Sequence, residues 1–137
     1  MKWLSSLFLL TGLCFGQSVR MIPVNSQPAV SLQATASVPA QDNTRHVADM
    51  VCFSASSITA TTPTQLSVNL RDGATGAGTV LASFIVTTTA ATGQNQAPFC
   101  ASMQVAGSNA TAMTLEYSAL LTNLFEQVTL FYHNAPQ

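Results

Sequence analysis

Few side chains in this chain of 137 residues could do acid–base or nucleophilic chemistry: it holds two His, five Asp or Glu, and four Lys or Arg. His46 and Asp49 could supply the base and the orienting carboxylate of a Ser-His-Asp triad, with one of many Ser residues as nucleophile. The Gly-x-Ser-x-Gly turn that presents such a Ser in many hydrolases is absent from the sequence. We therefore expect His46 and Asp49 to be solvated where a strand begins, and His133 to lie on the outward face of the last strand.

The sequence gives still weaker support for two other kinds of site, a pair of catalytic carboxylates and a zinc site. Glu116 and Glu126, on neighbouring predicted strands, could approach the separation of about 5–9 Å that glycosidase carboxylates need. Carboxylates within sheets are usually exposed, and this is our interpretation of both. A zinc site needs Cys and His at close, paired spacings, which this chain lacks. The sequence thus predicts no catalytic, metal-ligating or cofactor-binding residue, and no enzyme.

Residues 72–78 (DGATGAG) superficially resemble a glycine loop that cradles phosphate. Such loops open a helix and usually carry a Lys, whereas this segment precedes a predicted strand and has none. Its single carboxylate also falls short of the several oxygen ligands that Ca²⁺ requires. We expect it to be the turn of a β-hairpin.

The N-terminal residues 1–16 have the order of a secretory signal peptide, with Lys2, a largely apolar run over residues 4–13 and small residues around Gly16. The run is well short of the roughly 20 residues of a membrane-spanning helix. We expect cleavage after Gly16 and a protein that is secreted or at the cell surface, extracellular or periplasmic, without a membrane partner. The alternatives are a lipoprotein modified at Cys14 and a buried N-terminal strand or helix.

Signal cleavage would leave two cysteines, Cys52 and Cys100, and an even count in an exported chain predicts one disulfide. Alternation along the strands places Cys52 opposite Val51 and Phe53, and Cys100 opposite Phe99. Both sulfurs then point away from the main core. We expect a bridge that links neighbouring strands, or a strand and a loop, with a Cα separation below about 7 Å. The alternative is two unpaired buried thiols.

Apolar residues recur at every second position through most of the chain, which is typical of half-buried β-strands. Strands are predicted over residues 18–24, 30–38, 46–55, 65–71, 79–89, 98–106, 113–118 and 126–133. Residues 79–89 are almost continuously β-branched and apolar, which predicts a central strand. Residues 118–125 could instead form a helical turn between two strands.

Gly, Pro, Asp and Asn separate these runs and supply the backbone conformations that turns need. About eight short strands with such punctuation predict an all-β fold, an antiparallel β-sandwich or jelly roll. The chain length corresponds to a single domain. We assign this domain to residues 29–137, and residues 17–28 to an N-terminal extension or a first short strand.

Only 7% of the residues are charged, against about 25% in a typical soluble domain. Four basic residues are too few to replace phosphate counterions, which excludes a nucleic-acid partner. Outward strand positions carry mainly Thr, Ser, Gln, Asn and Ala, so little charge keeps neighbouring molecules apart. The sequence therefore predicts a secreted structural or adhesive module, a subunit of an extracellular assembly or filament that contacts itself or other surface proteins.

Two alternative functions stay open at this point. The first is a monomeric carbohydrate- or surface-binding module, for which Phe125 and Phe131 are the obvious candidates for exposed aromatic side chains. The second is a small hydrolase, which would require a cleft with paired titratable groups. Asn109 begins a three-residue N-glycosylation sequon, a motif that also occurs often by chance.

Residues 66–81 (LSVNLRDGATGAGTVL), 111–117 (TAMTLEY) and 125–130 (FEQVTL) together resemble small β-sandwich proteins of tailed bacteriophages. Those are virion-associated proteins of head-decoration or tail-associated type. The resemblance covers residues 64–133 and rests on a strand, the Asp-Gly turn and two later strands. It implies a structural or binding role without catalysis, and no functional residues carry over. The signal peptide departs from this pattern and suggests a secreted bacterial relative of the fold.

Overall fold

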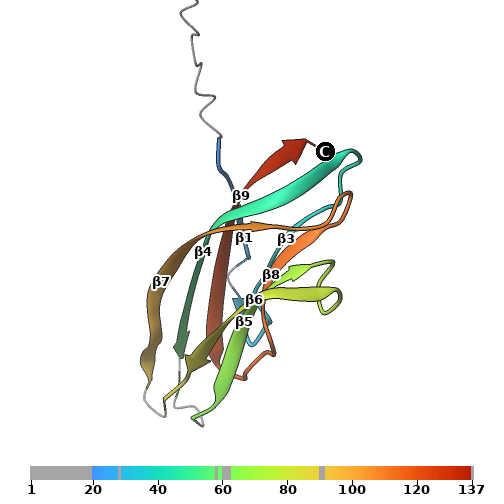
Figure 1. The fold of residues 1–137 in the computed structure, drawn as a ribbon. Coiled ribbons are helices and arrows are strands. Elements are labelled where there is room, and N and C mark those ends of the chain that lie inside the picture. The colour runs from blue at the N-terminus through green and yellow to red at the C-terminus, as the bar shows by residue number, and fades with distance from the viewer. Residues whose placement is uncertain (1–19, 28, 58, 60–62, 90–91, 137) are drawn as a thin grey trace, which may run out of the picture.

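A computed structural model describes residues 20–27, 29–57, 59, 63–89 and 92–136, which form nine β-strands and no helix (Figure 1). The strands are β1 (Ile22–Asn25), β2 (Ala29–Val30), β3 (Thr35–Val38), β4 (Thr44–Ser57), β5 (Gln65–Asp72), β6 (Thr79–Thr87), β7 (Gly93–Ala106), β8 (Met113–Tyr117) and β9 (Leu124–Pro136). The predicted signal peptide, residues 1–16, lies outside the described residues.

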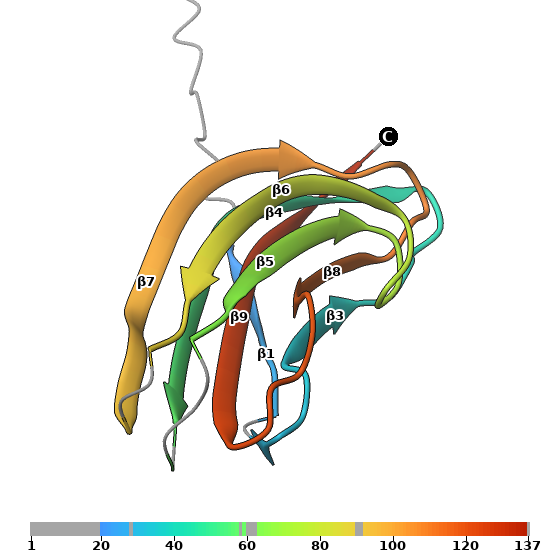
Figure 2. The same ribbon diagram turned by 90° about the horizontal axis from the view of Figure 1, so that it is seen from below.

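The strands form two antiparallel sheets packed face to face. The first sheet has the order β1-β9-β4-β7, with β2 also paired to β9, and the second has the order β3-β8-β5-β6. Strands of both layers bend in the same direction (Figure 2). The predicted all-β antiparallel sandwich is therefore confirmed.

Alternate residues of both sheets fill the space between them, as the period-two pattern predicts. On β5, Leu66, Val68 and Leu70 are all buried. The other strands contribute Val38, Val51, Phe53, Ala55, Val86, Met113, Leu115, Tyr117, Leu124, Val128 and Leu130 to the same cluster. Removing these apolar side chains from water is the main term that stabilises such a two-layer fold.

The single strand predicted over residues 30–38 is wrong. Ser31 has a φ of 58° and breaks the run, so that β2 pairs with β9 in the first sheet while β3 pairs with β8 in the second. The backbone N–H of Ser31 donates to the carbonyl of Leu124 (3.0 Å) and holds this crossing in place. The apolar alternation continues across this break, but only Ala34, Ala36 and Val38 are buried, whereas Val30 and Leu32 are exposed.

Residues 79–89 do not form a central strand as predicted. Among the described residues, strand β6 pairs only with β5 and lies at the edge of the second sheet, and 72% of Ile85 is exposed. β-Branched residues favour extended backbone at an edge as well as in the centre, so composition alone does not distinguish the two positions. The alternative of a helical turn over residues 118–125 is also wrong. None of these residues is helical, and a non-helical turn at residues 122–123 leads directly into β9 at Leu124.

Candidate functional site

The two cysteines lie directly opposite each other in the pairing of β4 with β7. Cys52 and Cys100 are joined by a disulfide, with a Cα–Cα distance of 4.1 Å. The predicted bridge between neighbouring strands is thus confirmed, and the alternative of two unpaired buried thiols is wrong. Because β7 pairs with no strand other than β4 among the described residues, the disulfide fastens an edge strand to the middle of the first sheet.

The side of the first sheet that faces away from the core is called here the outer face. Its side chains come from alternate positions of three neighbouring strands: Phe125, Gln127, Thr129, Phe131 and His133 from β9, Asp49, Met50, Cys52 and Ser54 from β4, and Pro98, Cys100, Ser102 and Gln104 from β7. The strand register places Met50 between Phe131 and Ser102. This face therefore carries hydroxyl, amide, thioether and aromatic groups, and its only carboxylate among these residues is Asp49.

A β-bulge brings the Asp49 carboxylate to the outer face. The register of β4 with β9 jumps from Ala48 to Met50, which leaves Asp49 as the extra residue, and bulges of this kind redirect a side chain. Its carboxylate accepts one hydrogen bond from Gln104 Nε2 (2.8 Å) and another from His133 Nδ1 (2.8 Å). Three strands thus hold one buried carboxylate in a fixed position.

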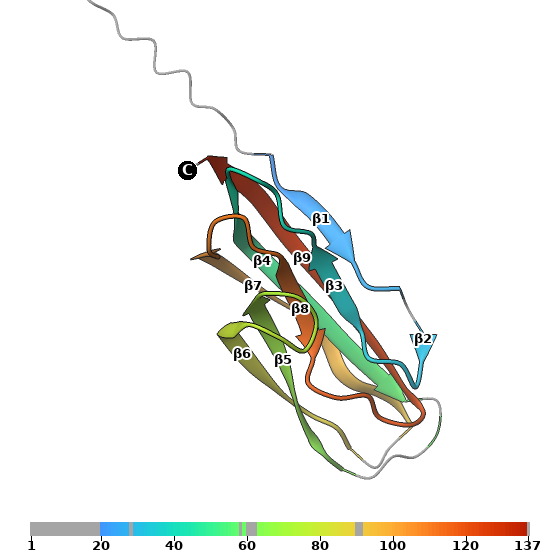
Figure 3. The ribbon, with the colours of Figure 1, turned by 90° about the vertical axis from the view of Figure 1, so that its right-hand side faces the viewer.

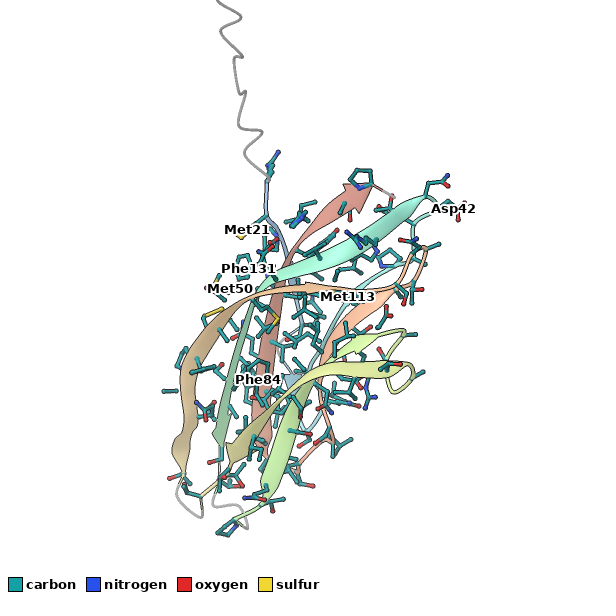
Figure 4. All side chains as sticks on the ribbon, viewed as in Figure 1. Met21, Asp42, Met50, Phe84, Met113 and Phe131 are labelled. Atoms are coloured by element: carbon teal, nitrogen blue, oxygen red, sulfur yellow. A yellow bond between two sulfur atoms is a disulfide. The ribbon has the colours of Figure 1, made fainter. Side chains whose placement is uncertain are left out.

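A hollow of about 550 Å³, called here the upper hollow, opens beside the Asp49 carboxylate. Its lining consists of Met21, Asp49, Met50, Ser102, Met103 and Gln104. Met21 and Phe131 lie together with Met50 at this end of the sheet (Figure 4). A ligand in this upper hollow would meet a carboxylate, an amide and a hydroxyl within an otherwise apolar wall, the combination typical of small-molecule sites.

Two smaller hollows continue along the outer face on the other side of the disulfide. One of about 200 Å³ is lined by Cys52, Phe53, Ser54, Pro98, Gln127 and Thr129. The next, of about 210 Å³, is lined by Ser54, Ala55, Ser56, Gln96, Pro98, Phe125 and Gln127. Phe125 and Phe131, six positions apart on one face of β9, are separated by roughly 20 Å of strand. The hollows together follow the length of the sheet.

His46 and Asp49 do not form the dyad considered from the sequence, and the prediction that both are solvated is wrong. His46 is 1% exposed, with Nδ1 against Asn134 Oδ1 (2.8 Å) and Nε2 against the carbonyl of Pro39 (2.9 Å). Strand β4 already begins at Thr44, so both residues lie inside the sheet rather than before it. The partner of Asp49 is His133, which lies on the outward side of the last strand as predicted.

Glu116 is buried, although we expected it to be exposed. It belongs to β8 in the second sheet, and its carboxylate accepts hydrogen bonds from Arg71 Nε (2.6 Å) and from the backbone N–H of Gly76 (3.0 Å). The predicted hairpin turn after β5 is confirmed, and it covers this carboxylate. A positive partner and a backbone donor together compensate the buried charge.

Glu126 is buried as well, again against expectation, but it belongs to β9 in the first sheet and faces the core. Its Oε2 accepts a hydrogen bond from the backbone N–H of Ala34 (3.1 Å), while Oε1 has no hydrogen-bond partner among the described residues. Burial raises the pKa of this carboxyl from 4.5 to about 7, against the opposing effect of the Ala34 hydrogen bond. Glu116 and Glu126 therefore do not face one shared site.

The part of the chain that the structure describes contains no gathering of three His, Cys, Asp or Glu side chains able to hold a metal ion. It also contains no helix long and apolar enough to cross a membrane.

The two sheets and the Cys52–Cys100 bridge define the chain as a disulfide-linked antiparallel β-sandwich module. No protein-family model and no curated protein matches the sequence, so the resemblance to bacteriophage virion-associated proteins stays a prediction. A solved structure described as "CBM4 structure and function" is similar to this chain with a TM-score of 0.37 and 15% identity. The match covers 77% of this chain and 61% of that one, so the chain spans less than two thirds of its length.

Proposed function

We propose that the protein is an exported, non-catalytic module that binds a neutral glycan chain along the outer face of the first sheet. The observation that carries the proposal is the upper hollow, where Asp49, Gln104 and Ser102 surround a space of about 550 Å³. Hydroxyl groups of a sugar can donate to the carboxylate and accept from the serine hydroxyl. The amide oxygen of Gln104 stays available to a ligand, because its Nε2 is the atom bonded to Asp49.

The shape and charge of the outer face favour a long, uncharged ligand. The hollows extend on both sides of the disulfide, and the apolar C–H face of a sugar ring can pack on Phe125 or Phe131. None of the side chains that line these three hollows is a Lys or Arg. An anionic polysaccharide would find no cation there, and this favours a neutral one.

Export and the lack of catalysis are also part of the proposal. The Cys52–Cys100 disulfide is of the kind that persists in oxidising compartments, and the predicted signal peptide provides the route. The single Asp–His pair of the outer face has no second carboxylate beside it, since Glu116 and Glu126 are buried elsewhere. Binding without bond cleavage is the activity that this set of side chains supports.

Calorimetric titration with soluble neutral and anionic polysaccharides tests this function. We expect binding of a neutral polymer and a loss of about tenfold in affinity in Gln104→Ala or Phe131→Ala, which corresponds to about 1.4 kcal/mol, the size of one net contact. Val80→Ala is the matched control, because Val80 is 44% exposed and belongs to β6 in the second sheet, not to the outer-face strands. Equal affinity in all variants, or preference for anionic polymers, would refute the proposal.

A subunit of an extracellular assembly stays the second candidate function. One observation favours it: the edge strands β6 and β7 contain no Asp, Glu, Lys or Arg. Charged residues at edges are a usual means by which soluble β-proteins avoid pairing with other chains.

A further inference from the structure

The sandwich has one open side, formed by the edge strands β6 and β7. They are the last strands of the second and first sheets, and they lie on the same side of the molecule (Figure 2). On the opposite side, the edges are the four-residue strands β1 and β3, which lie side by side (Figure 3). Short edge strands, and the proline Pro23 within β1, protect that side. On the open side, β6 and β7 are longer, at nine and fourteen residues, and β7 holds a single proline, Pro98.

Apolar side chains gather between the two open edges. The rings of Phe53 and Phe99 have centroids 5.2 Å apart, and Phe84 lies 5.5 Å from Phe53. They line a hollow of about 180 Å³ together with Ile85 and Gln96. Ile85 is 72% exposed and Phe99 is 45% exposed. An exposed apolar patch rimmed by polar residues marks an interaction surface.

We propose that a second copy of this chain covers the open side. Strand β7 then pairs antiparallel with its counterpart in the second copy, and β6 does the same, about one twofold axis perpendicular to both sheets. Each sheet continues from one molecule into the other. This inference gives the second candidate function a partner, and it does not depend on glycan binding.

The charge of the edges fits this partner. In a twofold arrangement each strand meets itself in the opposite direction, so any charged residue would approach its own like charge. The nine residues of β6 and the fourteen of β7 contain none, so self-pairing brings no like charges together. Backbone N–H and C=O groups on the free edges supply the hydrogen bonds, as in other strand additions.

The size of the open side also fits a second copy better than a single added strand. At about 3.3 Å per residue and a depth of about 10 Å, the edges of β7 and β6 present roughly 450 and 300 Å². Two copies that pair both edges would bury roughly 1,500 Å², within the range of about 1,200–2,000 Å² for stable interfaces. Pairing through β7 alone would bury roughly 900 Å², below that range. Both edges must therefore take part.

Light scattering after size-exclusion chromatography, over a range of protein concentrations, tests the proposal. We expect a species of twice the mass of one mature chain and an at least tenfold weaker dimer in Ile85→Lys. The matched control Leu32→Lys also places a charge on an exposed apolar residue, but on the far side, and should leave the dimer intact. Circular dichroism and melting temperature show whether each variant is folded.

Hydrogen exchange of the β7 amides gives a second, independent measurement. In the dimer, these amides should exchange more slowly than in Ile85→Lys at the same concentration. A wild-type protein that stays monomeric at several hundred micromolar would overturn the proposal. So would a dimer that Ile85→Lys leaves unchanged, or one that Leu32→Lys weakens equally. Slowed exchange of β7 only after addition of a different protein would assign the open side to that protein instead.

Discussion

Replacing the buried carboxyl of Glu126 should stabilise this protein at neutral pH. Glu126 is 1% exposed, and one of its oxygens has no hydrogen-bond partner among the described residues. Its pKa is raised from 4.5 to about 7 because burial disfavours the charged form. The nearby Tyr117 responds to the same carboxylate, because burial and the negative charge of Glu126 both raise the pKa of its phenol.

The direction of the pH effect follows from these values. Between pH 4.5 and 7 the folded protein keeps the Glu126 proton while the unfolded chain has released it. The folded state therefore binds more protons, and the free energy of unfolding falls as the pH rises. A difference of about 2.5 pKa units corresponds to about 3 kcal/mol of free energy of unfolding. This contribution is fully present below pH 4.5 and is lost once the pH passes about 7.

Urea denaturation at several pH values from 4.5 to 8 measures this effect. Glu126→Gln, which keeps the shape but not the charge, should remove the corresponding part of the pH dependence and be about 3 kcal/mol more stable than the wild type at pH 8. Glu116→Gln is the matched control, because the Glu116 charge is compensated by Arg71, and it should give no such gain. Equal stability of Glu126→Gln and the wild type at pH 8 would refute the reasoning.

Three further perturbations test other parts of the structure by the same denaturation measurement. Arg71→Met should cost about 3 kcal/mol, because it leaves the buried Glu116 without its cation. Gly78→Ala should cost more than Gly76→Ala: both glycines have positive φ, but only at Gly78 would the added Cβ meet backbone, 2.1 Å from a carbonyl oxygen. Reduction of the disulfide, which joins residues 48 positions apart, should cost about 4 kcal/mol and speed amide exchange in β7.

Each of these expectations has a clear contrary result. If Arg71→Met and the double variant with Glu116→Gln are equally unstable, the loss does not come from an uncompensated charge. If the two glycine variants are equally stable, the contact of Gly78 with the Asp72 carbonyl does not constrain the hairpin. If reduction leaves the β7 amides unchanged, the edge strand is held by backbone pairing alone.

The fold class was predictable because it rests on local patterns. Side chains alternate between the two faces of a strand, so Leu66, Val68 and Leu70 must share a face whatever the rest of the chain does. The same parity placed Cys52 and Cys100 on the side away from the core, where the structure has their disulfide. Turn residues are equally local, and the hairpin at residues 72–78 follows from its glycines.

The surroundings of the polar residues were decided by tertiary contacts that no local pattern contains. Asp49 meets His133, 84 positions away, only because a bulge turns it outward. Glu116 is neutralised by Arg71, 45 positions away, whereas Glu126 receives only a hydrogen bond from the backbone N–H of Ala34, 92 positions away. The sequence by itself determined a sparsely charged antiparallel sandwich with one disulfide, because periodicity is read within a strand. The tertiary structure alone decided which sheet each strand joins, which carboxylates are buried and which edges stay open, because these depend on pairing between distant segments.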